Sequence, residues 1–131
     1  MKIRYFLPLF LTAAVLGGCS ATVQSDSGGL PDRDPELAYR LVKEEGALVL
    51  DVRTPGEFLS VRLPGARNIP IEQLPQRLQE VERLVNNDKK RPIVVYCTVG
   101  TRAAQAKRIL LAAGFPNVTN LGGFSDWPRH R

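Results

Sequence analysis

The sequence predicts a three-layer α/β domain whose central sheet is mainly parallel and flanked by helices. Residues 47–50 and 93–96 are apolar at every position, which is typical of strands buried on both faces of a parallel sheet. Stretches with helical spacing of apolar residues alternate with these runs, and such alternation is typical of α/β domains. The length of 131 residues corresponds to about one domain.

The composition limits the classes of function. Hydrophobic residues make up 44% of the chain and charged residues 24%, which excludes a disordered or collagen-like protein. The net charge is +5, of which Lys2 and Arg4 supply two charges, and the modest remaining excess favours small anionic substrates. No Lys/Arg stripe is interleaved with aromatic residues, so nucleic acid is not an expected partner.

Residues 1–18 have the layout of a secretory signal. A cationic start is followed by an apolar run from Tyr5 to Leu16 and by two glycines before Cys19. The run is too short for a typical transmembrane helix, which needs about 20 apolar residues. The polar residues 20–29 argue against a core strand or helix here, so residues 19–33 are expected to form a flexible tether and residues 34–131 the domain.

The junction Leu16-Gly17-Gly18-Cys19 resembles the lipobox of bacterial lipoproteins. The resemblance implies cleavage before Cys19, acylation of Cys19, and a cell-envelope location with the membrane as a partner through the lipid. Ser20 follows the cysteine where an Asp commonly implies inner-membrane retention, so the periplasmic face of the outer membrane is expected if the organism has one. An ordinary cleaved signal with a spare cysteine is the alternative.

The first half of the domain begins with a helix. Asp34 can cap it, Pro35 suits its first position, and Gly46 ends it. The strand at 47–50 follows, then a polar loop over 51–56, a helical turn at 57–60 and a short strand at 66–69.

The second half repeats the alternation. Apolar residues at helical spacing predict a helix over about 72–85, before the strand at 93–96. A further helix is expected over 101–113, where Gly114 and Pro116 stop it. A short strand over 117–120 and a final turn and helix over 121–127 complete the domain.

Cys97 is the strongest candidate for chemistry. It follows a buried strand and precedes a helix, and ligands of open α/β sheets bind at the carboxyl ends of strands. If Cys19 is acylated, Cys97 has no intramolecular disulfide partner, which is unusual outside the cytoplasm. A buried cysteine that serves only as a small hydrophobe is the alternative reading.

The loop after Cys97 is suited to an anion. Gly100 permits a tight path that aims successive amides at one point, the helix start adds partial positive charge, and Arg102 adds a full one. These features favour thiolate over thiol, unless Gly100 serves only a turn and Arg102 only a solvated surface. The predicted substrate-binding loop comprises Thr98, Val99, Gly100, Thr101 and Arg102.

Four ordered motifs resemble the rhodanese family over about residues 34–128: LDVRTPGEF at 50–58, LPGARNIP at 63–70, VYCTVGTR at 95–102 and LGG with Trp127 at 121–127. The resemblance implies a sulfurtransferase that carries sulfur as a Cys97 persulfide, cradled by the backbone of 98–102 and closed by Arg102. The implied partners are an anionic donor such as thiosulfate or a persulfide, and cyanide, a thiol or a protein as acceptor. The sequence contains no metal-ligand cluster and no nucleotide-binding glycine motif, so no cofactor is expected.

Two further residues match the family at the end of the first core strand. Asp51 and Arg53 correspond to its acidic and basic pair, and we expect them near the site, orienting the loops. A purely structural ion pair is at least as good an interpretation, and the same holds for Glu57. Arg67 is either an attractor of the anionic donor or a surface charge.

The chain departs from the family pattern at one place. Val61-Arg62 stand where members usually have Gly-His. The family fold is still expected, but Arg62 changes the local charge, so the substrate preference is left open. His130 lies in a basic tail beyond the last motif and is given no catalytic role.

Three other functions share parts of this pattern. A phosphatase or arsenate-type enzyme is disfavoured because only four residues separate Cys97 from Arg102, one fewer than its loop needs for a tetrahedral oxyanion. A non-catalytic binding module is the main alternative, although inactive rhodanese-like domains usually lose the cysteine. A redox sensor lacks a resolving cysteine within 34–131.

Overall fold

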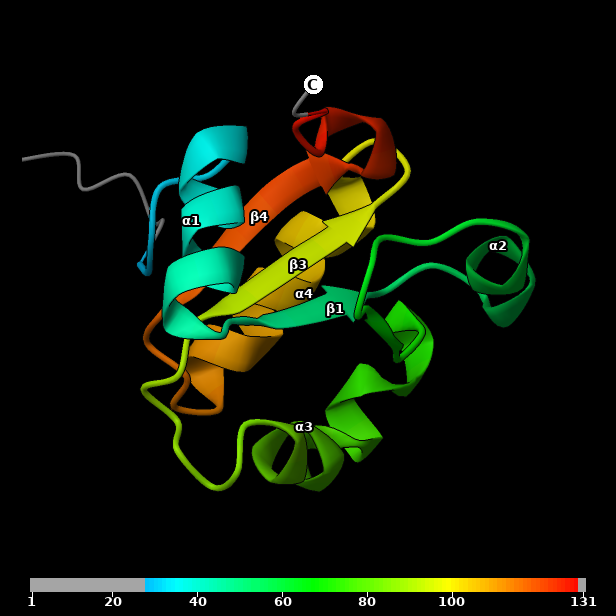
Figure 1. The fold of residues 1–131 in the computed structure, drawn as a ribbon. Coiled ribbons are helices and arrows are strands. Elements are labelled where there is room, and N and C mark those ends of the chain that lie inside the picture. Colours follow the sequence, from blue (N-terminus) through cyan, green and yellow to red (C-terminus); the bar gives the residue numbers. More distant parts are fainter. Residues whose placement is uncertain (1–27, 130–131) are drawn as a thin grey trace, which may run out of the picture.

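The structure is a computed structural model that describes residues 28–129, and it is built on one sheet (Figure 1). The strands are β1 (Leu48–Asp51), β2 (Arg67–Asn68), β3 (Ile93–Cys97) and β4 (Val118–Gly123). They lie in the order β2-β1-β3-β4, and every pair is parallel. The α/β class with a parallel sheet is therefore confirmed.

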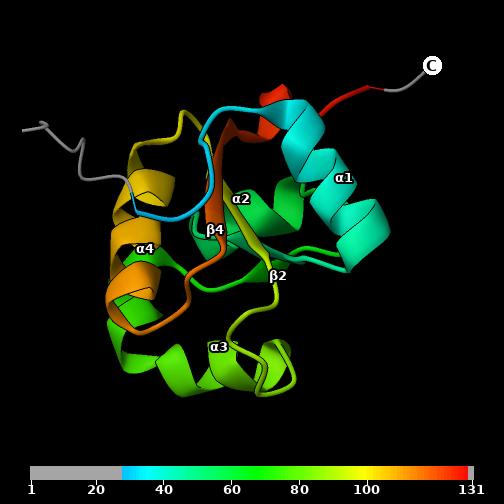
Figure 2. The ribbon, with the colours of Figure 1, turned by 90° about the vertical axis from the view of Figure 1, so that its left-hand side faces the viewer.

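Helices cover both faces of this sheet (Figure 2). The helices of the chain are α1 (Pro35–Glu45), α2 (Pro55–Ser60), α3 (Leu78–Leu84) and α4 (Thr101–Ala112), with 3₁₀ turns η1 (Ile71–Gln76) and η2 (Phe124–Asp126). Of the α-helices, α1 covers one face and α3 and α4 the other, while α2 lies beyond the end of β1 (Figure 1). Alternate strand residues point to opposite faces. Val49, Val94 and Tyr96 pack with α1, whereas Leu50, Val95 and Cys97 pack in the other core layer, with residues of α3 and α4.

The first helix begins and ends where its capping residues predict. Asp34 accepts a hydrogen bond from the Leu37 amide at 2.9 Å, and Pro35 occupies the first helical position. Gly46 ends α1 in the left-handed region at φ 64°, where a side chain would be strained. These local signals set the position at which β1 enters the sheet.

Two elements differ from the sequence expectation. The helix expected over 72–85 is divided into η1 and α3, because Pro75 has no amide hydrogen to donate within a continuous helix. The strand expected over 117–120 continues to Gly123 as β4, and only η2 remains of the helix expected over 121–127. Pairing of Tyr96 with Gly122 and of Cys97 with Gly123 extends the strand.

Residues 30–33 also differ from the flexible tether expected for 19–33. The Leu30 amide donates to the Val118 carbonyl at 3.1 Å, and the Arg33 amide donates to the Asn120 carbonyl at 2.8 Å. The Lys107 ammonium donates to the Leu30 carbonyl and to Asp32, both at 2.6 Å. Residues 30–33 therefore supply hydrogen-bond partners to backbone groups on the outer edge of β4, which would otherwise be unpaired.

The expected signal segment, 1–18, and Cys19 lie outside the described residues, as does His130. Within 28–129, no helix has the length and apolar character needed to cross a bilayer.

Candidate active site

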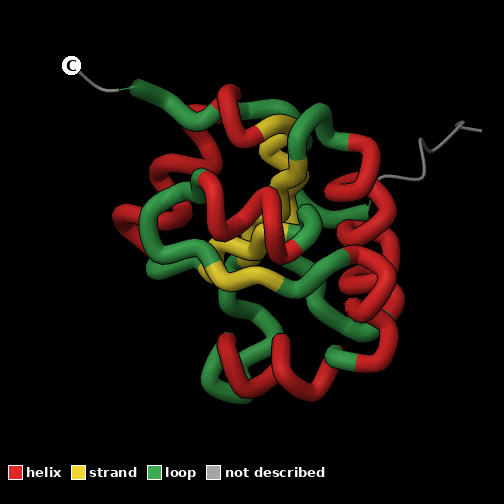
Figure 3. The backbone as a smooth tube through the Cα atoms, turned by 90° about the vertical axis from the view of Figure 1, so that its right-hand side faces the viewer, coloured by secondary structure: helices red, strands yellow, loops and turns green. Residues whose placement is uncertain are grey.

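The candidate site lies at the carboxyl edge of the sheet, which Figure 3 views from the side toward which the strands of Figure 1 point. Loops or helices that follow β1, β3 and β4 meet there, because parallel strands end at the same edge. Cys97 is the last residue of β3.

The Cys97 side chain is fully buried, in the core layer that includes α4. Its sulfur accepts a hydrogen bond from the Gly100 amide at 2.9 Å. An amide directed at a sulfur stabilises a thiolate more than a thiol, and the start of α4 adds positive potential at the same point. The geometry therefore suits an anionic sulfur on this residue.

Gly100 is required by the path of the loop. Its φ is 96°, and a Cβ there would lie 2.5 Å from Nη2 of Arg33 and 3.1 Å from Cα of Gly122. The positive φ strains any residue with a side chain here, and a Cβ would also displace the Arg33 guanidinium. Val99, at the tip of the loop, is 67% exposed.

Two residues that the sequence reasoning did not select hold this loop. Arg33 donates from Nη2 to the Val99 carbonyl at 3.1 Å, and Asn120 donates from Nδ2 to the Gly100 carbonyl at 3.1 Å. Asn120 also accepts from the Gly122 amide at 2.8 Å. The sequence signal for Asn120 is an amide side chain within a buried strand. No sequence signal marks Arg33, because its contact spans 66 residues.

Arg102, in the first turn of α4, pairs with Glu57 of α2. Its guanidinium donates to the two Glu57 carboxylate oxygens at 2.8 and 3.1 Å, and to the Thr98 hydroxyl at 3.0 Å. The guanidinium holds the pKa of Glu57 well below its usual range, and the carboxylate raises the pKa of Arg102. The structure thus brings Arg102 to the loop, with its charge matched by a carboxylate.

Asp51 and Arg53 form a buried ion pair behind the same edge. Arg53 donates from Nη2 to Asp51 at 2.6 Å and to the Val61 carbonyl at 2.6 Å. Its guanidinium also lies 5.4 Å from the centre of the Tyr96 ring, and burial raises the pKa of Tyr96 to about 12. This pair fixes the chain after α2, so its contacts are those of an orienting and structural pair.

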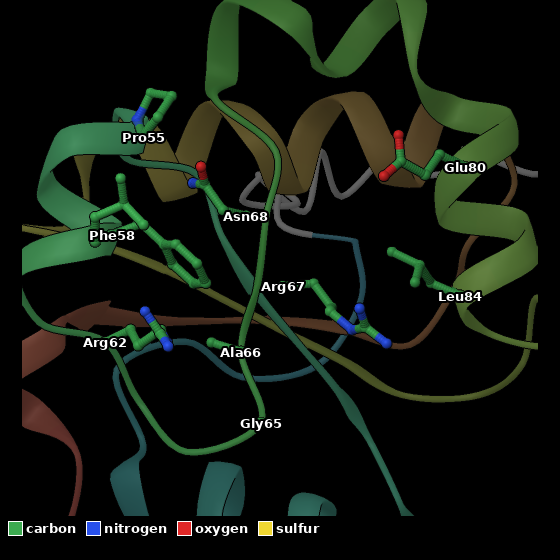
Figure 4. Close-up of a pocket in the computed structure, with 10 residues that line it drawn as sticks. Pro55, Phe58, Arg62, Gly65, Ala66, Arg67, Asn68, Glu80 and Leu84 are labelled. Carbon is green, nitrogen blue, oxygen red and sulfur yellow. The ribbon is translucent and has the colours of Figure 1, made fainter.

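A separate cleft of about 760 Å³ lies beside α2 (Figure 4). Arg62, Arg67 and Glu80 are among its lining residues, and Arg62 stacks over the Phe58 ring at 4.8 Å. Cys97 and the loop 98–102 do not line this cleft. Arg62, which stands where the family usually has histidine, therefore places its positive charge at the cleft and not at the loop after Cys97.

No group of three or more His, Cys, Asp or Glu side chains suited to a metal occurs in the part of the chain that the structure describes. Every buried side-chain nitrogen or oxygen there has a hydrogen-bond partner.

The fold and the loop together define an α/β domain in which one free cysteine accepts a hydrogen bond from a backbone amide of the loop that opens a helix. A family model described as the rhodanese-like domain matches residues 34–130. The chain belongs to the rhodanese-like domain family.

Known relatives agree with this assignment. A sulfurtransferase of Allochromatium vinosum is 37% identical over 95 residues, which cover 72% of this chain and 83% of the relative. The thiosulfate sulfurtransferase PspE of Escherichia coli is 35% identical over 77 residues, covering 59% and 70%. The solved human single-domain sulfurtransferase TSTD1 has 26% identity and a TM-score of 0.61, covering 77% of this chain and 95% of its own. The protein is therefore of the sulfurtransferase type.

Proposed function

We propose that the protein transfers a sulfane sulfur from thiosulfate or a persulfide donor to a thiophilic acceptor through a persulfide on Cys97. The observation that carries the proposal is the Gly100 amide directed at the Cys97 sulfur in a loop that opens α4. That arrangement stabilises a negative charge on sulfur, both in the attacking thiolate and in the terminal sulfur of the persulfide.

The reaction has two steps in this proposal. The Cys97 thiolate attacks the outer sulfur of thiosulfate, the S–S bond of the donor breaks, and sulfite leaves with the electron pair. An acceptor such as cyanide or a thiolate then attacks the outer sulfur of the persulfide and regenerates the Cys97 thiolate. A relative supports the choice of thiosulfate as donor, since PspE of Escherichia coli is a thiosulfate sulfurtransferase.

Intact mass spectrometry tests the proposal. After incubation with thiosulfate, we expect the mass of one added sulfur atom on Cys97, and cyanide should remove it with release of thiocyanate. If neither thiosulfate nor glutathione persulfide loads sulfur while Cys97 still reacts with an alkylating reagent, the protein is instead a non-catalytic binding module.

We further propose that the domain is held to a membrane of the cell envelope by acylation of Cys19. The support is the order of residues 1–19: a cationic start, a short apolar run, two glycines and a cysteine. Replacing Cys19 by alanine should prevent labelling with a palmitate analogue and move the protein out of the membrane fraction. Equal labelling of the variant would contradict the proposal.

A further inference from the structure

Glu57 forms an ion pair with Arg102, the cation of the predicted substrate-binding loop over 98–102. The Glu57 and Arg102 side chains are each about one third exposed, so the pair lies at the surface of the site and not in the core. The Thr98 hydroxyl donates to the second carboxylate oxygen of Glu57 at 2.9 Å. The charge that Arg102 adds to the loop is therefore already matched before any donor binds, and the Arg33 guanidinium, which donates to the Val99 carbonyl, is a second positive charge beside the loop.

The Glu57 carboxylate is held in this position from its own helix as well. Its Oε1 accepts from the Thr54 amide at 3.2 Å and from the Thr54 hydroxyl at 3.1 Å, which completes a capping box at the start of α2. These contacts and Arg102 keep the pKa of Glu57 far below neutrality. The carboxylate consequently stays ionised at every pH at which a thiolate is a useful nucleophile.

The consequence is a matter of net charge. A thiolate at Cys97, the Glu57 carboxylate and the Arg102 guanidinium together carry one negative charge, which the Arg33 guanidinium beside the loop offsets. Removing the Glu57 carboxylate makes this sum more positive by one unit. Coulomb energy scales with the charge of the approaching group, so an extra carboxylate disfavours a dianion twice as strongly as a monoanion at the same place.

From this arrangement we infer that Glu57 is a specificity-determining residue that acts through Arg102 and favours sulfur donors with one negative charge over the dianion thiosulfate. The inference rests on the proposed sulfur transfer and ranks its donors, with singly charged organic thiosulfonates and persulfides ahead of thiosulfate. With any of these donors the Cys97 thiolate forms a bond to the outer sulfur, the S–S bond of the donor breaks, and the rest of the donor leaves with the electron pair. From thiosulfate the leaving group is sulfite, and from methanethiosulfonate it is methanesulfinate.

The test variant is Glu57→Gln, because glutamine also completes a capping box while it removes the charge. Glu80→Gln is the matched control: Glu80 pairs with Arg77 at 2.8 Å in a pair of the same exposure, and it lines the cleft beside α2 instead of contacting the loop. Both variants lower the negative charge of the chain by one, so only position distinguishes them.

The first measurement is alkylation of Cys97 in the full chain by iodoacetate, an anion, and by neutral iodoacetamide. We expect Glu57→Gln to raise the ratio of the two rate constants by about 3- to 10-fold at low salt, and Glu80→Gln to leave it unchanged. The ratio cancels any change in the thiolate fraction, since both reagents react with the same thiolate. High salt should reduce the effect, because it screens exposed charges.

The second measurement is sulfur loading from thiosulfate and from methanethiosulfonate. We expect Glu57→Gln to raise kcat/KM for thiosulfate relative to methanethiosulfonate by a similar factor, because the two donors differ by one negative charge. An unchanged alkylation ratio in Glu57→Gln would overturn the inference, as would loss of both alkylations with an intact fold. A changed alkylation ratio without sulfur loading in any variant would instead refute the proposed transfer and leave the charge role of Glu57 established.

Discussion

Replacing Cys97 by serine is expected to abolish sulfur loading and to lower the transfer rate by more than about 1,000-fold, because a hydroxyl cannot carry the sulfur as a persulfide. Serine is nearly isosteric with cysteine, and its oxygen can accept the hydrogen bond that the Gly100 amide now donates to sulfur. The side chain at this position is fully buried, so the smaller serine oxygen fits the space that the sulfur fills. Thiocyanate production from thiosulfate and cyanide measures the loss.

The control for this prediction is the fold of the variant. The Cys97→Ser protein should keep the circular dichroism spectrum of the parent and unfold in a single cooperative transition. Transfer activity retained in a correctly folded Cys97→Ser variant would show that sulfur is not carried on this residue, and the proposed mechanism would then be wrong.

The second large effect is on stability. Arg53→Met should lower the free energy of unfolding by about 3–5 kcal/mol, because it leaves the Asp51 carboxylate buried without its counter-charge. Asp51 is fully buried, and its hydrogen bonds to the Arg53 guanidinium are 2.6–3.1 Å long. The same change removes the hydrogen bond from Arg53 to the Val61 carbonyl, which holds the chain after α2 in place. Urea denaturation followed by tryptophan fluorescence gives the difference.

Arg77→Met provides the comparison. Arg77 also forms a two-oxygen pair, with Glu80, but about one third of each side chain is exposed. Solvated pairs of this kind contribute about 0–1 kcal/mol, so the variant should unfold near the midpoint of the parent. Equal destabilisation by Arg53→Met and Arg77→Met would show that burial of the Asp51 pair does not decide its contribution.

Local signals in the sequence identified much of the architecture. The fully apolar runs predicted β1 and β3, since only strands covered on both faces tolerate apolar residues at every position. Asp34, Pro35 and Gly46 predicted both ends of α1, because capping depends on residues adjacent to the helix end. Cys97 and Gly100 were found for the same reason, since they lie three residues apart in one loop.

Contacts between distant residues were decided only by the tertiary structure. The sequence contains Glu57 and Arg102 but not their pairing, because packing of α2 beside the start of α4 joins residues 45 positions apart. Arg33 was assigned to a tether, yet β4 leaves an unpaired edge that this segment covers, and this brings its guanidinium to the loop.

The sequence by itself determined the α/β class, the cysteine and the loop that follows it, because periodicity, capping and a strand-to-helix turn are written in neighbouring residues. Only the tertiary structure decided that the loop's arginine faces a carboxylate, that Asp51 and Arg53 fix the chain after α2, and that the thiol is buried. Those properties depend on which surfaces meet when the layers pack, and no local pattern records them.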